Sequence, residues 1–257
     1  MKAIMLAAGV GSRLVGESGD HPPKVLLKFG GKTLLQRHIE SLRACGVTQL
    51  TIVIGYQADQ IVDEINRIGA RDMVRTIFND RFREGNIISL WYARQELTSG
   101  DDVLLMDGDV LYDVRILERL LAAENPNSFL VDRDFEQGDE PVKLCIRDEQ
   151  IVEFRKWLSA EYDWCGESVG FFRFSPDVAQ QLVDQTQLYI ENNKVFDWYE
   201  EALRDILLTG SRDRFGWEDI TGLPWIEIDF QEDVEKAGTE VLPAMQEPSE
   251  DAIRRAV

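Results

Sequence analysis

The stretch Ile4–Lys24 reads I-M-L-A-A-G-V-G-S-R-L-V-G-E-S-G-D-H-P-P-K, and the fold is expected to form around it. It begins within a near-continuous apolar run, Lys2–Ala8, which is typical of a parallel strand that is buried on both faces. Gly9 and Gly11 end this run, and small residues at such a turn let backbone N–H groups approach an anion closely. Arg13 follows with a planar, permanently charged side chain. The stretch therefore predicts a buried strand that leads into an anion-binding turn.

Two better-defined phosphate-binding patterns do not fit this turn. A Walker loop requires a Gly-Lys-Ser/Thr triplet, and no such triplet follows Gly9. The dinucleotide fingerprint G-x-G-x-x-G is not matched by Gly9, Gly11 and Gly16, and the segment Arg13–Pro23 is expected to be a long loop rather than a helix. The stretch ends at Lys24, whose backbone is stiffened by the two prolines before it. An ordinary strand-to-helix turn that binds no ligand remains an alternative.

The wording L-A-A-G-V-G-S-R-L, followed by P-K, resembles the signature loop of the nucleotidyltransferases that make activated sugars and alcohols. That loop usually carries Thr where this chain has Ser12. The resemblance implies that Arg13 and Lys24 are catalytic and hold the triphosphate of a nucleotide, with Lys24 at the α-phosphate. It also implies a set of nucleotide-binding residues, which are Leu6, Ala7, Ala8, Gly9, Gly11, Ser12 and Asp107.

Composition narrows the class of protein. A chain of 257 residues is long enough for one large α/β domain or two small ones. It has 28 Lys and Arg residues against 47 Asp and Glu residues, and the resulting charge of −19 argues against a nucleic-acid partner or an anionic membrane surface. The sequence shows no signal peptide and no apolar run of ~20 residues, so we expect a soluble, cytoplasmic protein. Cys45, Cys145 and Cys165 are scattered and are expected to be reduced thiols.

Buried strands and amphipathic helices alternate through the first part of the chain. Strands are expected at Leu50–Ile54 and Met73–Phe78, and helices at Thr33–Cys45 and around Ile61–Ile68. This alternation is typical of βαβ units, which build a parallel sheet with right-handed crossovers. We therefore expect an α/β, Rossmann-like fold with a mostly parallel central sheet and helices on both faces. A single nucleotidyltransferase domain is expected over 1–257, with a nucleotide-binding half at about 1–110 and an acceptor-binding half at about 111–257.

The segment Asn79–Leu97 follows the third expected strand. Gly85 and Asn86 precede an expected helix, and the structural interpretation of Asn86 and Ser89 is a helix cap and a tolerated polar position. The wording E-G-N-I-I-S-L, however, resembles the corresponding segment of the bacterial phosphocholine cytidylyltransferases. This resemblance implies that Gly85, Asn86 and Ser89 bind the nucleotide, with Asn86 and Ser89 at the Watson–Crick edge of a cytosine.

A second focus is the run V-L-L-M-D-G-D at Val103–Asp109. A buried strand that ends in carboxylates brings them to the carboxyl edge of the sheet, where α/β folds bind ligands. We assign Asp109 to Mg²⁺, because this ion prefers one or two carboxylates together with phosphate oxygens and water. The resemblance implies a second metal ligand at Asp229, which ends the run W-I-E-I-D, with Glu227 as a supporting residue on the same face. Polar strand ends without a metal are the structural alternative.

The second half is expected to add a small mixed β extension that builds the acceptor site. Its strands are expected at Phe129–Val131, Val142–Ile146, Ile151–Phe154 and Ser168–Phe174, with a hairpin turn at Arg147–Gln150. A lone lysine is usually solvated, but the resemblance implies a catalytic role for Lys156 beside the phosphates. It also implies that Glu167 and Gly170 lie beside the acceptor.

Two clusters in the second half mix aromatic and acidic side chains. An aromatic face attracts a quaternary ammonium group by about 0.5–2 kcal/mol, and carboxylates add opposite charge. A helix is expected at Asp197–Leu208, and its structural interpretation makes Tyr199 part of the core-facing side. The resemblance to the phosphocholine enzymes instead implies acceptor-binding residues in these clusters, which are Trp157, Trp164, Asp197, Tyr199 and Glu200.

Together these features predict a Mg²⁺-dependent enzyme that transfers CMP from CTP to phosphocholine or a similar small phosphate or phosphonate. Because two anions must meet in this reaction, positioning and charge neutralisation are expected to supply the catalysis. The expected partners are CTP and a small, choline-like phosphorylated acceptor, and a homodimer is compatible with the sequence. A sugar-1-phosphate nucleotidyltransferase is the alternative enzyme, and a nucleotide-sensing module is the alternative without catalysis.

Overall fold

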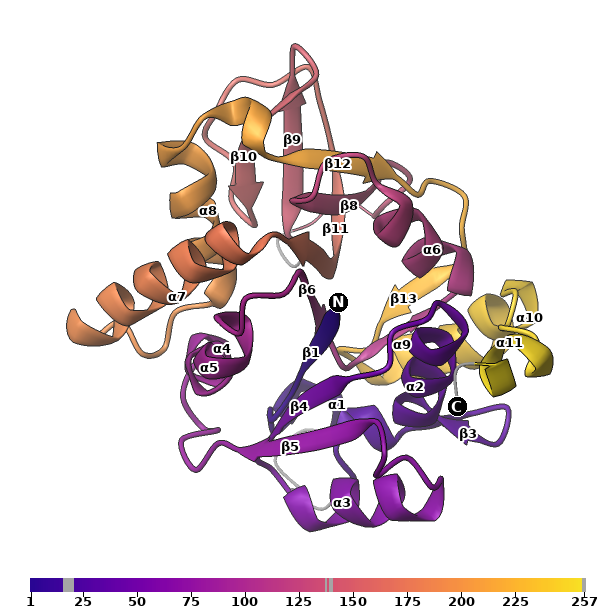
Figure 1. Cartoon of the computed structure of the whole chain (residues 1–257). Coiled ribbons are helices and arrows are strands. Elements are labelled where there is room, and N and C mark those ends of the chain that lie inside the picture. The colour runs from indigo at the N-terminus through magenta and orange to yellow at the C-terminus, as the bar shows by residue number, and fades with distance from the viewer. Residues whose placement is uncertain (16–20, 137, 139–140, 256–257) are drawn as a thin grey trace.

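Strand β1 (Lys2–Ala7) lies inside a nine-stranded sheet, whose main order is β10-β9-β11-β6-β1-β4-β5 (Figure 1). It pairs in parallel with β4 (Leu50–Ile54) on one side and with β6 (Val103–Asp107) on the other. Strand β5 (Val74–Phe78) continues the parallel half beyond β4. The computed structural model describes residues 1–15, 21–136, 138 and 141–255. The parallel half confirms the predicted succession of βαβ units.

Strand β11 (Trp164–Phe174) joins this parallel half to a mixed extension, because it runs antiparallel to β6, β8 and β9. The other strands of the extension are β8 (Ser128–Asp132), β9 (Lys143–Arg147), β10 (Gln150–Arg155) and β12 (Gly216–Asp219). The predicted mixed extension is thereby confirmed. Strand β12 was not predicted, since its sequence G-W-E-D carries no apolar alternation; it pairs in parallel with β8.

The hairpin between β9 and β10 forms where the sequence predicts it. Asp148 and Glu149 occupy the turn with φ values of 50° and 60°, as a two-residue hairpin turn of the primed type requires. One difference concerns the start of β11, which lies at Trp164 instead of the expected Ser168. The longer strand places Cys165 directly opposite Cys145, so two thiols that are separated in sequence become cross-strand neighbours.

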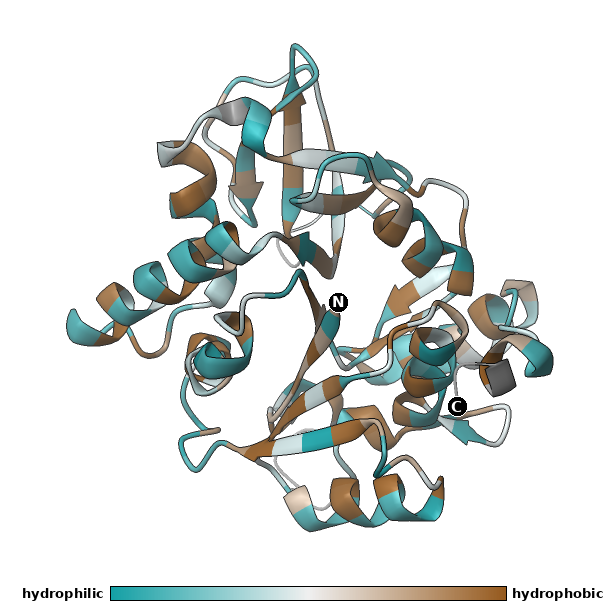
Figure 2. Ribbon diagram, in the orientation of Figure 1, coloured by the Kyte–Doolittle hydropathy of each residue, from teal (hydrophilic) through white to brown (hydrophobic). Residues whose placement is uncertain are grey.

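Helices cover both faces of the sheet, as predicted (Figure 1). One face is covered mainly by α2 (Leu34–Ala44), α3 (Ala58–Arg67) and α6 (Val114–Ala122). The opposite face is covered by α4 (Asn86–Tyr92), α7 (Pro176–Glu191) and α8 (Tyr199–Thr209). Figure 2 shows brown and teal bands alternating along these helices, because each turns an apolar side to the sheet. The expected single helix up to Leu97 is interrupted at Ala93, and α5 (Arg94–Leu97) follows.

The turn after β1 differs from its prediction. Ser12–Val15 forms the short helix α1, where a loop was expected. Residues 16–20 of the predicted loop lie outside the described residues. The chain then passes through a 3₁₀ turn, η2 (Lys24–Leu26), into the small hairpin β2–β3 at Lys28–Phe29 and Lys32–Thr33. The 3₁₀ turn therefore fixes the backbone that carries Lys24.

The chain returns to the sheet edge through its last part. Strand β13 (Trp225–Glu227) pairs antiparallel with β7 (Val110–Tyr112), which directly follows Asp109. The backbone N–H of Ile228 donates to the carbonyl of Asp109 at 2.9 Å and extends this pairing. Two segments separated by more than a hundred residues are therefore locked together at the point where both carry carboxylates.

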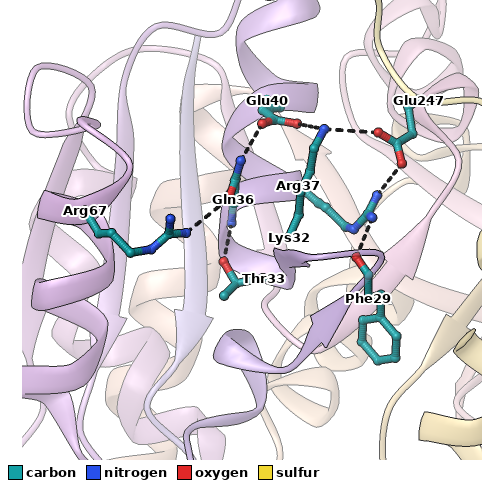
Figure 3. Close-up of polar contacts among 8 residues, drawn as sticks. All are labelled: Phe29, Lys32, Thr33, Gln36, Arg37, Glu40, Arg67 and Glu247. Atoms are coloured by element: carbon teal, nitrogen blue, oxygen red, sulfur yellow. Dashed lines mark hydrogen bonds and ion pairs between the residues drawn. The ribbon is translucent and has the colours of Figure 1, made fainter.

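Polar contacts fasten the C-terminal segment to α2 and its neighbours (Figure 3). Glu247 accepts hydrogen bonds from Lys32 at 3.1 Å and from Arg37 at 2.8 Å. Lys32 also donates to Glu40 at 2.7 Å, and Arg37 donates to the Phe29 carbonyl at 2.6 Å.

Within the part of the chain that the structure describes, no helix is long and apolar enough to cross a membrane.

Phe129 on β8 is expected to be a major contributor to stability. It is fully buried and makes edge contacts with Phe154, Phe172, Phe174 and Phe215, at centroid distances of 5.1, 5.2, 6.4 and 6.0 Å. Phe129→Ala should lower the free energy of unfolding by about 3–5 kcal/mol, because it removes a buried ring and leaves a cavity.

Urea unfolding followed by circular dichroism measures this loss. The matched control is Phe78→Ala on β5, where the ring is 55% exposed and the cost should stay below about 1 kcal/mol. Equal costs for the two variants would contradict the core position of Phe129.

Glu167 on β11 is expected to make the stability of the protein depend on pH. It lies opposite Asp132 on β8 and Lys143 on β9. Burial and then the charge of Asp132 raise the pKa of Glu167 from 4.5 to about 7. Between these two pH values the folded chain holds more protons than the unfolded chain, so stability falls as the pH rises through this window.

Glu167→Gln should therefore stabilise the fold at pH 8 by about 1–3 kcal/mol, and the gain should shrink towards zero near pH 4.5. Urea unfolding at the two pH values measures the difference. Glu161→Gln is the control, because Glu161 has an 89% exposed side chain and should show no comparable dependence. A gain that does not change with pH would rule out a raised pKa at Glu167.

Candidate active site

A cavity of about 340 Å³ opens at the carboxyl ends of β1 and β6, between the parallel half and the mixed extension. It brings together most of the residues predicted for the nucleotide and the metal, which are Leu6, Ala8, Gly9, Arg13, Lys24, Gly85, Asn86, Ser89, Asp107, Asp109 and Asp229. Predicted acceptor-side residues line it as well, and these are Lys156, Gly170 and Glu200. A smaller cavity of about 230 Å³ adjoins it at the turn after β1 and adds Ala7, Gly11 and Ser12 to the lining.

The turn after β1 keeps its backbone open to this space. A Cβ atom at Gly9 would meet no atom within 4 Å, so the backbone there is accessible to a ligand. Gly11 has a φ of +68°, and a Cβ atom on it would lie 3.1 Å from Cγ of Lys24. Glycine at this position therefore lets the Lys24 side chain pass close to the turn.

Lys24 connects the two predicted metal carboxylates. Its Nζ donates to Asp109 Oδ2 at 3.0 Å and to Asp229 Oδ1 at 2.7 Å. Arg13 donates to the same Asp229 oxygen at 3.0 Å. Burial alone would lower the pKa of Lys24, but the charges of Asp109 and Asp229 outweigh this effect and hold the pKa above its ordinary range. Lys24 therefore stays charged at neutral pH.

Three carboxylates meet beside this lysine. One oxygen each of Asp109, Glu227 and Asp229 lies within 4.8 Å of the other two. Desolvation and the charges of the two aspartates raise the pKa of Glu227 well above its ordinary value. Oxygen ligands of this kind are those that Mg²⁺ prefers, so the set fits a hard divalent cation.

Asp107 lies deeper in the cavity than Asp109. Its Oδ2 accepts a hydrogen bond from the Tyr199 hydroxyl at 2.9 Å. Desolvation, followed by the charges of Glu200 and Asp109, raises the pKa of Asp107 well above its ordinary value. Gly170 has a φ of +76°, and a Cβ atom on it would lie 2.4 Å from this oxygen, so a side chain there would be strained and would displace the Asp107 carboxylate. The carboxylate thus joins β6, β11 and α8 at the floor of the cavity.

The α4 side of the cavity carries two predicted base-binding residues. The hydroxyl of Ser89 accepts a hydrogen bond from Asn79 Nδ2 at 3.0 Å. The amide of Asn86 is turned towards α8, where its oxygen accepts from the backbone N–H of Tyr199 at 2.8 Å. Its Nδ2 donates to Glu200 at 3.3 Å. Ser89 and Asn86 therefore sit on one helix but are held by different partners.

The acceptor side combines a cation, an aromatic ring and a carboxylate. The Lys156 ammonium lies 4.8 Å from the centre of the Trp198 ring, and Trp157 packs against Trp198 with the ring centres 5.8 Å apart and the planes tilted by 34°. Trp198 and Glu200 both line the cavity. Burial raises the pKa of Glu200 to about 7, although its bond to Asn86 opposes the shift.

Several predicted acceptor residues do not line the main cavity. Tyr199 is fully buried and contacts lining residues through its hydroxyl, bonded to Asp107, and its backbone N–H, bonded to Asn86, whereas Trp157 packs against Trp198. Trp164 packs edge-on against Trp217 at 5.0 Å, because β11 begins at Trp164 and directs it to the outer end of the sheet. Two other predicted acceptor residues lie nearby. Asp197 precedes α8, and Glu167 lines a neighbouring acidic cavity of about 660 Å³.

Sequence reasoning assigned no site role to seven residues that line the cavity, which are Phe82, Glu84, Val142, Phe154, Ser168, Phe172 and Trp198, whereas Glu227 was expected as a supporting residue. The signal for Trp198 was present in the run F-D-W-Y-E-E, but the helix begins one residue after Trp198. Lys143 is a structural residue here, because its ammonium donates to the carbonyls of Gly138, Pro141 and Lys156.

Two known cytidylyltransferases are similar to this chain in sequence. Over 255 residues the chain is 24% identical to the CTP:phosphoglutamine cytidylyltransferase of Campylobacter jejuni, covering 91% of this chain and 98% of that protein. It is 35% identical over 100 residues to the choline-phosphate cytidylyltransferase of Streptococcus pneumoniae, covering 38% of this chain and 42% of that protein.

Solved structures show the same fold at low identity. The CTP:phosphocholine cytidylyltransferase of S. pneumoniae superposes with a TM-score of 0.70 at 21% identity, covering 92% of this chain and 97% of that one. The inositol-1-phosphate CTP transferase of T. maritima gives 0.70 at 22% identity, with 95% and 97% covered. The family described as the MobA-like NTP transferase domain matches residues 3–165, which include the turn after β1, Lys24, Asp107 and Asp109. The chain belongs to this nucleotidyltransferase family.

Proposed function

We propose that the protein is a Mg²⁺-dependent cytidylyltransferase, which transfers CMP from CTP to a small phosphate or phosphonate that carries a cationic group, such as phosphocholine. The observation that carries the proposal is the cluster of Arg13, Lys24, Asp109 and Asp229 at an open glycine turn. In an acidic protein, Arg13 and Lys24 offer two local cations to a triphosphate, and Asp109 and Asp229 would add a divalent metal ion to them. The reaction belongs in the cytoplasm, and one domain over 1–257 would carry it out.

The nucleotide fits the side of the cavity that the parallel strands build. The glycine turn offers backbone N–H groups to the phosphates, and Arg13 and Lys24 offer charge. Asp109 and Asp229, with Glu227 beside them, would hold Mg²⁺. When bound, this ion would neutralise charge on the phosphates. The preference for cytosine is supported by relatives that are named as cytidylyltransferases, one of them with CTP in its name.

The acceptor fits the side of the cavity that the mixed extension and α8 build. The Trp198 face already attracts the Lys156 ammonium, so it can also attract a cationic group of a substrate. Glu200 adds opposite charge beside it. Lys156 would then meet the acceptor phosphate. An acceptor oxygen would attack the α-phosphorus, the bond to the β-phosphate would break, and pyrophosphate would leave with the electron pair.

A sugar-1-phosphate acceptor is less well supported. The described lining on the acceptor side offers an aromatic face beside a carboxylate, Trp198 and Glu200, as a cationic group needs, and one hydroxyl group, that of Ser168 on β11. Release of pyrophosphate, measured with Mg²⁺, four nucleoside triphosphates and a panel of acceptors, tests the proposal. Turnover with CTP and a cationic phosphate is expected. Turnover with sugar phosphates alone would select the alternative enzyme, and no turnover with any pair would select a nucleotide-sensing module.

Asp109→Asn and Asp229→Asn should each lower kcat by about 100–1,000-fold, because each removes charge that holds the metal and orients Lys24. Pyrophosphate release at saturating substrates measures the loss, and circular dichroism checks that the fold is intact. Asp101→Asn is the control. Asp101 is an exposed partner of Lys2, and it precedes β6, at the end of the strand that is opposite the site. Full activity in either site variant would remove that aspartate from the metal site.

Trp198→Ala should raise the KM for a cationic acceptor by about 10-fold and leave the KM for CTP within about twofold. The expected reason is loss of the aromatic face on the acceptor side alone. Steady-state kinetics with both substrates varied measures the two constants. Tyr162→Ala removes another partly exposed aromatic ring of the same half and serves as the control. A change in the KM for CTP only would contradict the assignment of the two sides.

A further inference from the structure

The side-chain amide of Asn86 accepts a hydrogen bond from the start of a helix that follows it by more than a hundred residues in the sequence. Helix α8 begins at Tyr199, and the first N–H groups of a helix have no partner within it. Trp198, at the cap position, provides no side-chain hydrogen bond. Asn86 Oδ1 accepts the Tyr199 N–H at 2.8 Å instead, and Asn86 Nδ2 donates to Glu200 at 3.3 Å. The helix cap is therefore supplied from α4.

The backbone next to Asn86 is fitted to the same segment. The N–H of Gly85 donates to the carbonyl of Val195 at 2.8 Å. A Cβ atom on Gly85 would lie 2.3 Å from the Asp197 carbonyl oxygen and 2.7 Å from the Phe196 carbonyl carbon. No side chain fits between these backbones, so Gly85 allows the turn before α4 to lie directly against the approach to α8.

These contacts control the position of two cavity residues. Trp198 and Glu200 flank Tyr199 at the start of α8, and both line the acceptor side of the cavity. The Tyr199 hydroxyl donates a hydrogen bond to Asp107 at 2.9 Å, which fixes the side chain of Tyr199. Asn86 fixes the backbone N–H of the same residue. A shift of this turn would move the aromatic ring and the carboxylate together.

We infer that Asn86 is a positioning residue for the acceptor side, which acts by capping α8, and that reading the nucleobase is not its main task. The consequence for catalysis rests on the proposed function, whereas the link between Asn86 and α8 does not. Ser89 provides the contrast, because its hydroxyl is bonded to Asn79 and makes no bond to α8. Ser89 and its neighbours therefore remain the candidates for contact with the base.

Hydrogen–deuterium exchange tests the link without any substrate. Asn86→Ala should speed the exchange of amides in residues 195–203 by about tenfold, or about 1.4 kcal/mol, because the buried Tyr199 N–H loses its partner. Ser89→Ala should leave exchange in 195–203 unchanged. Unchanged exchange in the Asn86 variant would overturn the inference, whatever the enzyme acts on. If Asn86→Ala does not fold, Asn86→Leu takes its place, because it keeps the volume of the side chain but removes both the acceptor for the Tyr199 N–H and the donor to Glu200.

Kinetics test the consequence for the reaction. Asn86→Ala should raise the KM for the acceptor by about tenfold and change the KM for CTP by less than about twofold. A rise in the KM for CTP alone would overturn the inference and identify Asn86 as a base reader. If the wild-type protein turns over no pair of substrates, the proposed function fails, and the exchange experiment still decides the role of Asn86.

A pair of substitutions that exchanges the donor and the acceptor between positions 86 and 200 tests whether the contact between them can be restored. In a Glu200→Gln background, Asn86→Asp offers an acceptor to Tyr199 and a second acceptor to the new glutamine amide, so the donor and acceptor exchange places. Asn86→Asp should therefore raise the acceptor KM by a smaller factor in this background than in the wild type. Equal factors in both backgrounds would show that Asn86 and Glu200 are not coupled and would overturn the assignment of Glu200 as a residue that Asn86 positions.

Discussion

The contact of Lys24 with Asp109 and Asp229 is the interaction on which the site depends. A lysine that is largely removed from water is costly unless opposite charge lies next to it, and two carboxylates in such proximity repel each other unless a cation separates them. Each group thus requires the other. The sheet satisfies this requirement because β1 and β6 are neighbours, and because β13 pairs with β7 and brings Asp229 to the same edge.

The same constraint explains how an acidic protein can attract a triphosphate. The net charge of −19 repels nucleotides at a distance, so attraction has to be local. Arg13 and Lys24 place two cations at one turn, beside the three carboxylates that would hold Mg²⁺. The two cations and the metal ion together would offset the repulsion where a phosphate would bind.

Much of this arrangement could be predicted from the sequence, and the limits have physical causes. The parallel half and the sites at Gly9, Lys24 and Asp109 follow local rules, since buried strands place their last residues at one edge of the sheet. The acceptor side does not follow such rules. Whether Tyr199 or Trp198 faces the cavity depends on where α8 begins, and that start is set by Asn86, a residue on another helix. Trp164 was misplaced because β11 extends four residues further than its apolar pattern indicates.

The antiparallel pairing of β13 with β7 also has a consequence for how the protein is made. The chain emerges from the ribosome from its N-terminus, at about 5–20 residues per second. The glycine turn and Asp109 are synthesised early, but Asp229 follows more than a hundred residues later. Until β13 pairs with β7, Lys24 has only one of its two carboxylate partners. In nascent chains, the contact of Lys24 with both carboxylates should therefore be completed as one of the last events of synthesis.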